Sequence, residues 1–273
     1  MKRLIYCLFL LVGLAACKSD RPKVEENETE LVGDSVSRPD TAVLRAPFEV
    51  YPQADGLFND FIDRFMSDDA FQYDRIEFPL KQLVNGEETK IDRAAWQYDS
   101  IYSDESDYTL IFDAPDVQKE TVRQSLKSAT VELVDLKMKR LKKYKFEHCG
   151  EHWLLTLTDE HDFSHDGKHD FYEFYSKFVS DVKFQVAHVQ DPFIFKTYDS
   201  DNFEEIEGNV SAEQWVDFRP ELPVERITNT IYNDEVPKSN YRTFVVVSPS
   251  SEMNCILVFK RVRGRWGLVS LEN

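Results

Sequence analysis

The sequence predicts an α+β fold made of two tandem domains, each with an N-terminal helix packed in a curved antiparallel sheet. A 23-residue stretch that begins at Phe58 returns 113 residues later at Phe171, with 8 identical positions and no gap. Both copies of this stretch have helical periodicity, and the second half of each copy alternates like β-strands. The chain of 273 residues is long enough for two such domains.

Residues 1–16 form a predicted lipoprotein signal peptide, and Cys17 is the predicted lipidation site. Lys2-Arg3 precedes an apolar run from Leu4 to Leu14 that is too short to span a bilayer as a helix. The run ends in Leu14-Ala15-Ala16-Cys17, which resembles a bacterial lipobox, where the cysteine thiol is acylated, as with palmitate. The alternative is an ordinary secretory leader. We expect anchoring to the lipid bilayer through Cys17 in the cell envelope, on a periplasmic or surface face that the sequence leaves open.

Residues 17–45 are predicted to be a disordered acidic tether, because they are polar and almost free of aromatic side chains. Asp34-Ser35-Val36 and Asp40-Thr41-Ala42 resemble bacterial O-glycosylation sites, although so short a pattern is equally compatible with chance. The formal net charge of −17 becomes −19 once Lys2 and Arg3 leave with the leader. A field of this sign attracts basic partners and argues against nucleic acid as a partner.

The two domains are predicted over residues 46–160 and 161–273, and each begins with a helix that carries one apolar stripe. The stripe residues are Phe58, Phe61, Ile62, Phe65 and Met66 in one copy and Phe171, Phe174, Tyr175, Phe178 and Val179 in the other. Asp68 and Asp181 then predict the cap of a second short helix or a turn. An extended segment follows and is expected to close at Pro79 or Pro192.

The second half of each copy predicts strands that end in a hairpin. Alternation predicts strands at 109–112, 131–138, 144–148 and 153–158 in the first copy and at 242–247, 254–262 and 265–271 in the second. Gly150 and Gly264 fit tight turns that need a positive φ. Trp153 and Trp266 lie 113 residues apart, so the repeat extends to the last strand. Trp96 and Trp215 also correspond if the second copy has a small insertion.

Both copies contain the phrase Phe-x-x-Phe-x-x-x-Phe-x-Ser-Asp-x-x-Phe-Gln. The chain resembles uncharacterised Bacteroidetes-type lipoproteins that contain a domain of unknown function. That family is associated with the cone-shaped fold of nuclear transport factor two and with the cystatin-like superfamily. The resemblance covers nearly all of the chain after the tether and implies two cone-like domains. It implies no particular chemistry, because this fold class includes dehydratases, isomerases, non-catalytic ligand cups and dimerising scaffolds.

The junction between the copies contains a twelve-residue pattern typical of calcium-binding loops. Its candidate metal ligands are Asp162, Ser164, Asp166, the carbonyl of Lys168, Asp170 and Glu173. A histidine at a usually apolar position and a strand before the loop depart from the pattern. The alternatives are an acidic linker that matches by chance and a zinc or copper site at His161, His165 and His169. Calcium is therefore the cofactor that the sequence suggests.

Arg75 and His188 occupy equivalent positions that would look into the pocket of a cone fold, where acid–base catalysts of the dehydratase type lie. Spacing reveals no Asp–His pair beside them. We therefore expect a non-catalytic protein that binds a small ligand or another envelope protein. The alternatives are a cone-fold enzyme of hydrolase, dehydratase or isomerase type and a structural scaffold stiffened by calcium.

Two further features concern cysteines and basic residues. Cys149 and Cys255 occupy non-equivalent positions, which favours unpaired thiols over a disulfide. A basic run lies in the first copy and is either a solvated strand face or a surface that docks the acidic second copy. It consists of Lys137, Lys139, Arg140, Lys142, Lys143 and Lys145.

Overall fold

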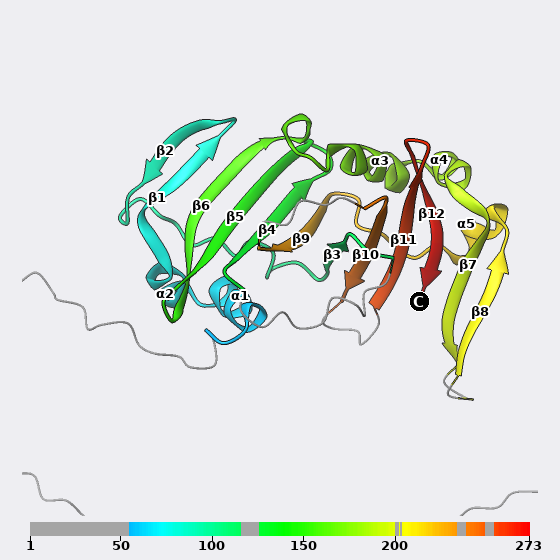
Figure 1. Cartoon of the computed structure of the whole chain (residues 1–273), viewed down its shortest axis with the longest axis horizontal. Helices are drawn as coiled ribbons and strands as arrows, with labels where there is room; N and C mark the ends of the chain where they lie inside the picture. The colour runs from blue at the N-terminus through cyan, green and yellow to red at the C-terminus, as the bar shows by residue number, and fades with distance from the viewer. Residues whose placement is uncertain (1–54, 116–125, 200–201, 203, 234–238, 249–253) are drawn as a thin grey trace, which may run out of the picture. The chain divides into compact units, whose positions relative to one another are not determined.

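The computed structural model describes residues 55–115, 126–199, 202, 204–233, 239–248 and 254–273 (Figure 1). The leader at 1–16, Cys17 and the tether lie outside these residues, so the predictions for them are not tested. Phe48–Asn273 forms one compact unit, to which all descriptions below refer. Within its described part, no helix combines the length and the apolar character needed to cross a membrane.

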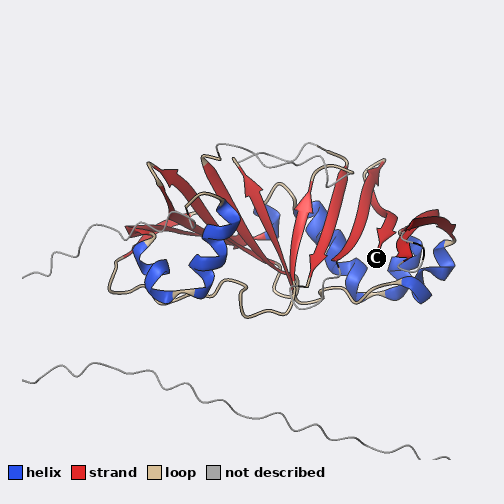
Figure 2. Cartoon of the chain, turned by 90° about the horizontal axis from the view of Figure 1, so that it is seen from below, coloured by secondary structure: helices blue, strands red, loops and turns tan. Residues whose placement is uncertain are grey.

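Each repeat begins with two consecutive helices, and Figure 2 shows these helices in blue beside the red strands. The helical elements are α1 (Phe58–Ser67), α2 (Asp69–Asp74), η2 (Phe163–His165), α3 (His169–Ser180), α4 (Val182–Ala187), η3 (Ala212–Gln214) and α5 (Trp215–Phe218). α1 buries all five predicted stripe residues and α3 buries four of its five, which confirms the predicted apolar faces. Asp68 and Asp181 cap α2 and α4 with their carboxylates, as predicted.

The first sheet has the order β2-β1-β6-β5-β4-β9, and its neighbours are antiparallel except for the parallel pair β1 and β6. Its strands are β1 (Ile76–Val84), β2 (Glu87–Ile91), β4 (Ser128–Asp135), β5 (Arg140–Cys149), β6 (His152–Asp162) and β9 (Arg226–Tyr232).

The second sheet has the order β3-β10-β11-β12-β7-β8, with one parallel pair, β12 and β7. Its strands are β3 (Tyr108–Phe112), β7 (Val189–Asp199), β8 (Glu204–Val210), β10 (Tyr241–Val247), β11 (Asn254–Val262) and β12 (Arg265–Glu272). Both sheets therefore place equivalent strands in the same order, as expected for two copies of one α+β domain.

The repeats exchange one strand with each other. β3 belongs to the first repeat in chain order but pairs with β10, and β9 belongs to the second repeat but pairs with β4. The two exchanged strands meet at Thr109 and Thr228, whose side chains bond to each other's backbone reciprocally. Each hydroxyl accepts the partner's N–H at 2.7 or 2.8 Å and donates to the partner's carbonyl at 2.6 or 2.7 Å. The repeats are thus related by an approximate twofold axis near this crossing.

Aromatic side chains fill the described interior of each repeat. In the first, the ring of Phe58 meets those of Phe146 and Trp153 edge to face at 5.5 and 5.0 Å. In the second, Phe171 meets Phe259 and Trp266 in the same way at 5.6 and 5.2 Å. Edge-to-face packing at these distances is favourable and leaves little free volume.

The glutamine retained in both copies has a structural role. Gln72 is fully buried, accepts the indole N–H of Trp96 at 3.2 Å, and donates to the carbonyl of Phe65 at 2.9 Å. Gln185 likewise accepts the indole N–H of Trp215 at 3.1 Å. These bonds satisfy polar groups that burial would otherwise leave without a partner. They also confirm the expected correspondence of the two tryptophans.

Some strands differ from the predicted ones. β1 and β7 continue past Pro79 and Pro192, so the expected closure there was wrong. Proline lacks an N–H, and the register of both parallel pairs shifts opposite these residues, which removes the need for that donor. β2, β8 and β9 were not predicted at all. The hairpin turns are confirmed, with φ of 67° at Gly150 and 79° at Gly264. The boundaries at 160 and 161 stay a prediction.

Candidate functional site

Arg75 and His188, the two residues predicted to face a cone pocket, follow the C-terminal ends of α2 and α4. Arg75 is 2% exposed and forms an ion pair with Asp55 at 3.0 Å. His188 is half-buried, its Nδ1 lies 2.8 Å from the carbonyl of Phe184, and its ring stacks on that phenylalanine at 3.8 Å. Neither residue lines the cavity described below. Their placement is that of helix-terminal packing residues.

The predicted calcium ligands do not converge. Each of the four carboxylates forms an ion pair with a different basic residue. The ion pairs are Asp166 with Lys143 at 2.6 Å, Asp170 with Arg261 at 2.5 Å, Glu173 with Lys139 at 2.9 Å, and Asp162 with Arg140 at 3.6 Å. The carbonyl of Lys168 accepts two N–H groups in the first turn of α3. The side chains of the described residues form no group of three or more metal-ligating side chains.

Calcium binding at this loop would therefore require several ion pairs to open. It stays a prediction, and a thermal melt of the protein in calcium and in chelator tests it. The strand expected before the loop is confirmed as β6, which ends at Asp162. Of the three histidines considered for zinc or copper, His161 lies 3.2 Å from Asp159 and His169 lies 2.9 Å from the carbonyl of Asp166.

A buried polar network lies at the junction between the repeats. Glu132 on β4 is fully buried and forms an ion pair with Lys168, whose side chain is 6% exposed. The same carboxylate accepts the Tyr172 hydroxyl and the Asn229 amide, each at 3.1 Å. Lys143 lies 3.6 Å from its other oxygen. Because these groups come from both repeats, the network joins them chemically as well as through the exchanged strands.

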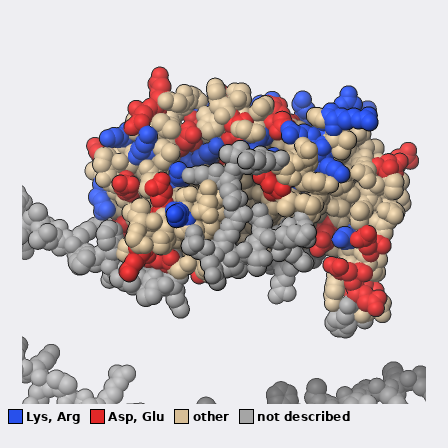
Figure 3. Space-filling view, in the orientation of Figure 1, with Lys and Arg blue, Asp and Glu red and all other residues tan. Residues whose placement is uncertain are grey.

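Part of the basic run pairs with acidic residues of the second copy, whereas Lys142 and Lys145 pair with Asp99 and Glu147 of the first copy. Lys139 pairs with Glu173 on α3, Lys143 pairs with Asp166, and Lys137 pairs with Glu225 before β9. Figure 3 shows basic and acidic side chains side by side on one face of the molecule. The cationic charges are therefore largely neutralised within the chain.

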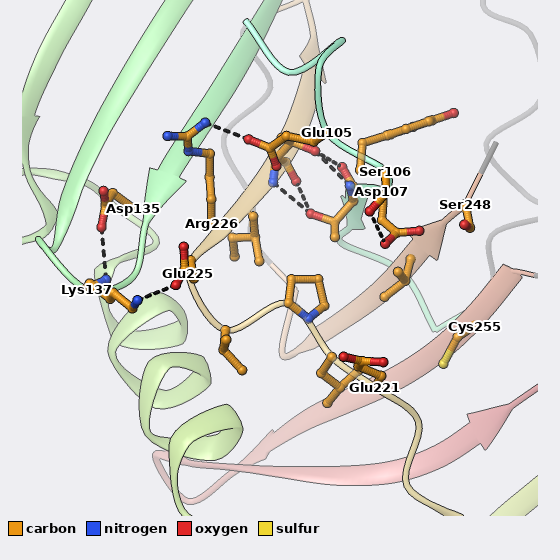
Figure 4. A pocket seen from close by; sticks show the side chains of 18 residues that line it. Glu105, Ser106, Asp107, Asp135, Lys137, Glu221, Glu225, Arg226, Ser248 and Cys255 are labelled. Carbon is orange, nitrogen blue, oxygen red and sulfur yellow. Dashed lines mark hydrogen bonds and ion pairs between the residues drawn. The ribbon is translucent and has the colours of Figure 1, made fainter. Parts of the chain in front are cut away.

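An open cavity lies where β3 and β9 begin, between the two repeats. It has a volume of about 900 Å³ and is lined mainly by residues 105–109 and 221–228. Asp135 and Lys137 lie at one end of it, and Ser248 and Cys255 at the other (Figure 4). We call this space the inter-repeat groove.

The inter-repeat groove follows the approximate symmetry of the chain. Thr109 and Thr228 both line it, and so do Asp107 and Arg226, which stand 119 residues apart like the two threonines. Asp135 and Ser248 are a further equivalent pair, 113 residues apart. The groove is therefore a product of the duplication and of the strand exchange.

Two ion pairs cross between the repeats at the groove. Arg226 donates to Glu105 at 2.6 Å, and Lys137 forms an ion pair with Glu225 (Figure 4). Both pairs are largely exposed, so each contributes at most about 1 kcal/mol to stability. Their main effect is to hold the segment before β9 against the first repeat.

The groove lining has little catalytic chemistry. It contains no histidine among the described residues, and its one serine–carboxylate contact is the exposed hydrogen bond from the Ser106 hydroxyl to the neighbouring Asp107 at 2.9 Å. Burial raises the pKa of the Cys255 thiol to about 12, so the nucleophilic thiolate is scarce at neutral pH. Cys149 and Cys255 are both free, as the sequence favoured.

Sequence reasoning did not find the groove, because its residues come from segments far apart in the chain. One signal was available. Residues 226–232 read Arg-Ile-Thr-Asn-Thr-Ile-Tyr, rich in the β-branched residues that favour strands. Their position corresponds to the predicted strand at 109–112. Recognition of β9 would have revealed that each copy has this strand, but not that the copies exchange it.

Comparison with known proteins supports the fold. A crystal structure of an NTF2-like protein from Bacteroides fragilis NCTC 9343 superposes with a TM-score of 0.73 and 32% sequence identity. The match covers 83% of this chain and 98% of that one. The cone-like α+β fold that the family resemblance implied is therefore confirmed.

None of the curated proteins matches this chain with significance. The profile of one family, described as a domain of unknown function (DUF4348), matches residues 41–273. That span includes both repeats and begins just before the end of the predicted tether. The chain therefore belongs to the DUF4348 family, with an NTF2-like fold.

Proposed function

We propose that this chain is a lipid-anchored protein of the cell envelope that binds a ligand in the inter-repeat groove without catalysing a reaction. The location of open space carries the proposal. The groove encloses about 900 Å³, whereas aromatic side chains fill the described interior of each repeat. Ligand sites typically occupy roughly 300–1,000 Å³ and combine apolar walls with a few polar groups.

The lining has this mixed character. Leu222, Ile227 and Val246 supply apolar surface, and Asp107 and Glu221 supply carboxylates. A general acid–base or nucleophilic reaction needs a titratable group poised near neutral pH, and the protonated Cys255 does not meet that need. Binding is therefore the activity that this lining supports best.

Lipid anchoring rests on the leader and on Cys17 in its Leu-Ala-Ala-Cys context. Metabolic labelling with an alkynyl palmitate analogue in a bacterial host tests it. We expect label in the wild-type chain and none in Cys17→Ser. Label that persists in Cys17→Ser would contradict anchoring through this residue.

Groove binding can be tested with an uncharged apolar dye, Nile red, and the chain without residues 1–17, which precede the compact unit Phe48–Asn273. Val224 lines the groove and is 53% exposed, so Val224→Trp should fill the groove without disturbing a core. Val262 is 55% exposed and does not line the groove, so Val262→Trp is the matched control.

We expect Nile red fluorescence to rise with wild type and with Val262→Trp, and this rise to be largely lost in Val224→Trp. Equal melting temperatures would show that the variants remain folded. Equal dye binding by both tryptophan variants would exclude the groove as the dye site and count against the proposed function.

A further inference from the structure

We propose that the occupant of the inter-repeat groove is an extended basic peptide segment of a partner protein, with lysine or arginine side chains next to apolar ones. This inference rests on the proposed function and adds the chemical class of the ligand. It is carried by the charges that the groove leaves unmatched, by its exposed apolar wall and by its open form.

The groove has more carboxylates than cations. Five acidic residues and two basic residues line it. Both basic residues already form ion pairs within the chain, Arg226 with Glu105 and Lys137 with Glu225. Asp107, Asp135 and Glu221 line the groove and form no ion pair with a cation among the described residues.

These three carboxylates are not equivalent. Asp135 accepts the backbone N–H groups of Lys137 and Met138 at 3.0 and 2.7 Å, which fixes it as part of a turn. Among the described residues, Asp107 accepts a hydrogen bond only from the Ser106 hydroxyl, at 2.9 Å. Glu221 is exposed on the opposite side of the groove from Asp135 (Figure 4). Asp107 and Glu221 are therefore the carboxylates best placed to receive cationic side chains.

Apolar surface accompanies these charges. Val224 is 53% exposed at the groove, and Leu222, Pro223 and Val246 are half-buried there. Exposed apolar side chains beside unpaired carboxylates fit a ligand that has both an apolar body and a positive charge. A purely polar cation would leave Val224 and the other apolar side chains of the groove exposed to water.

The form of the groove favours an extended segment over a compact amine. The lining reaches from Asp135 on β4 to Cys255 on β11, so it crosses the edges of both sheets instead of closing around one point. The formal net charge of −17 adds a long-range attraction for basic partners, which raises association rates.

The test uses the chain without residues 1–17 and two peptides, acetyl-Leu-Lys-Val-Lys-Leu-amide and the same peptide with glutamate in place of lysine. Binding is measured by calorimetry and by displacement of Nile red. The double variant Asp107→Asn/Glu221→Gln removes the two groove charges. Glu204→Gln/Glu205→Gln removes two exposed charges on β8, outside the groove, and is matched in net charge.

We expect the lysine peptide to bind, the glutamate peptide not to bind, and the groove variant to bind the lysine peptide about tenfold more weakly than the β8 variant. Binding should also weaken as salt rises. If both variants lose affinity equally, the attraction is a general field effect and the inference is wrong. If spermidine displaces the dye as well as the peptide does, the ligand is a small amine and the peptide assignment is wrong.

Failure of this inference is distinguishable from failure of the proposed function. Nile red that binds the groove while neither peptide competes would leave groove binding intact and overturn the basic peptide. If the wild-type chain binds neither Nile red nor the lysine peptide, both the basic-peptide inference and the proposed function are overturned.

Discussion

The buried ion pair between Glu132 and Lys168 offers the sharpest test of how the repeats are joined. Glu132 has no exposed surface, and Lys168 is 6% exposed in its side chain. In Lys168→Met the carboxylate would keep the hydrogen bonds from Tyr172 and Asn229 but lose its nearest cation. Removal of one partner of a buried pair costs about 3–5 kcal/mol.

We expect a loss near the lower end of that range, about 3 kcal/mol, because Lys143 lies 3.6 Å from the second oxygen of Glu132 and still shields it. For a domain of this size the loss corresponds to a decrease of roughly 6–12 °C in Tm. Urea unfolding at neutral pH, followed by tryptophan fluorescence, measures the free energy directly.

Two variants make this test specific. Lys139→Met also replaces a lysine by methionine, but in an exposed ion pair, where Lys139 is 53% and Glu173 is 37% exposed. This variant should lose at most about 1 kcal/mol of unfolding free energy. The double variant Glu132→Gln/Lys168→Met leaves no unpaired charge from the pair and should be more stable than Lys168→Met alone. A loss under about 1 kcal/mol in Lys168→Met, or a double variant that is no more stable than Lys168→Met, would refute the reasoning.

Three further predictions concern Asp166 at the junction, the buried Gln72 and the exchanged strands. Burial opposes ionisation of Asp166, but the hydrogen bond and the charge of Lys143 outweigh burial and lower the pKa of Asp166. The ionised Asp166 therefore stabilises the fold fully above the unfolded pKa of about 3.9, and this stabilisation is lost as pH falls through the folded pKa. Urea midpoints should therefore fall on acidification, and less steeply in Asp166→Asn. Gln72→Leu leaves the Trp96 indole and the Phe65 carbonyl unsatisfied and should cost roughly 2–4 kcal/mol in the same assay. Each half of the chain contains an edge strand of the other half's sheet. Cleavage after residue 162 should therefore yield halves that do not form folded monomers in size-exclusion chromatography and that recover native fluorescence when they are mixed. Stable monomeric halves would contradict this.

The elements that depend on local pattern could be predicted from the sequence, and those that depend on pairing could not. The stripe on α1 and the cap at Asp68 follow from neighbouring residues, and the hairpin at Gly264 follows from one residue's permitted φ. β2 and β8 are almost entirely exposed, so they have no buried alternation to detect.

Pairing of β3 with β10 joins residues more than 130 positions apart, and no single-sequence pattern specifies such a partner. The same limit applied to the functional site. Arg75 and His188 were singled out because the cone fold implies a pocket at that position, whereas here Arg75 satisfies Asp55 inside the first repeat. Aromatic side chains, many of them phenylalanine, fill the described interior of each repeat, and the inter-repeat groove lies at the boundary between the repeats.

That boundary differs from an ordinary contact between domains in one physical respect. In a simple tandem, two domains meet through side chains, and the contact can open at little cost. Here each repeat supplies a strand to the other's sheet, and Thr109 and Thr228 bond backbone to side chain across the crossing. Opening the junction would break ladder hydrogen bonds in both sheets and expose Glu132. The inter-repeat groove is therefore held by strand pairing in both sheets, which keeps Asp107 and its neighbours in a fixed arrangement. Because the groove is already ordered, the protein loses less conformational entropy when it binds a segment. The fixed positions also allow a few unpaired carboxylates to select a ligand by charge.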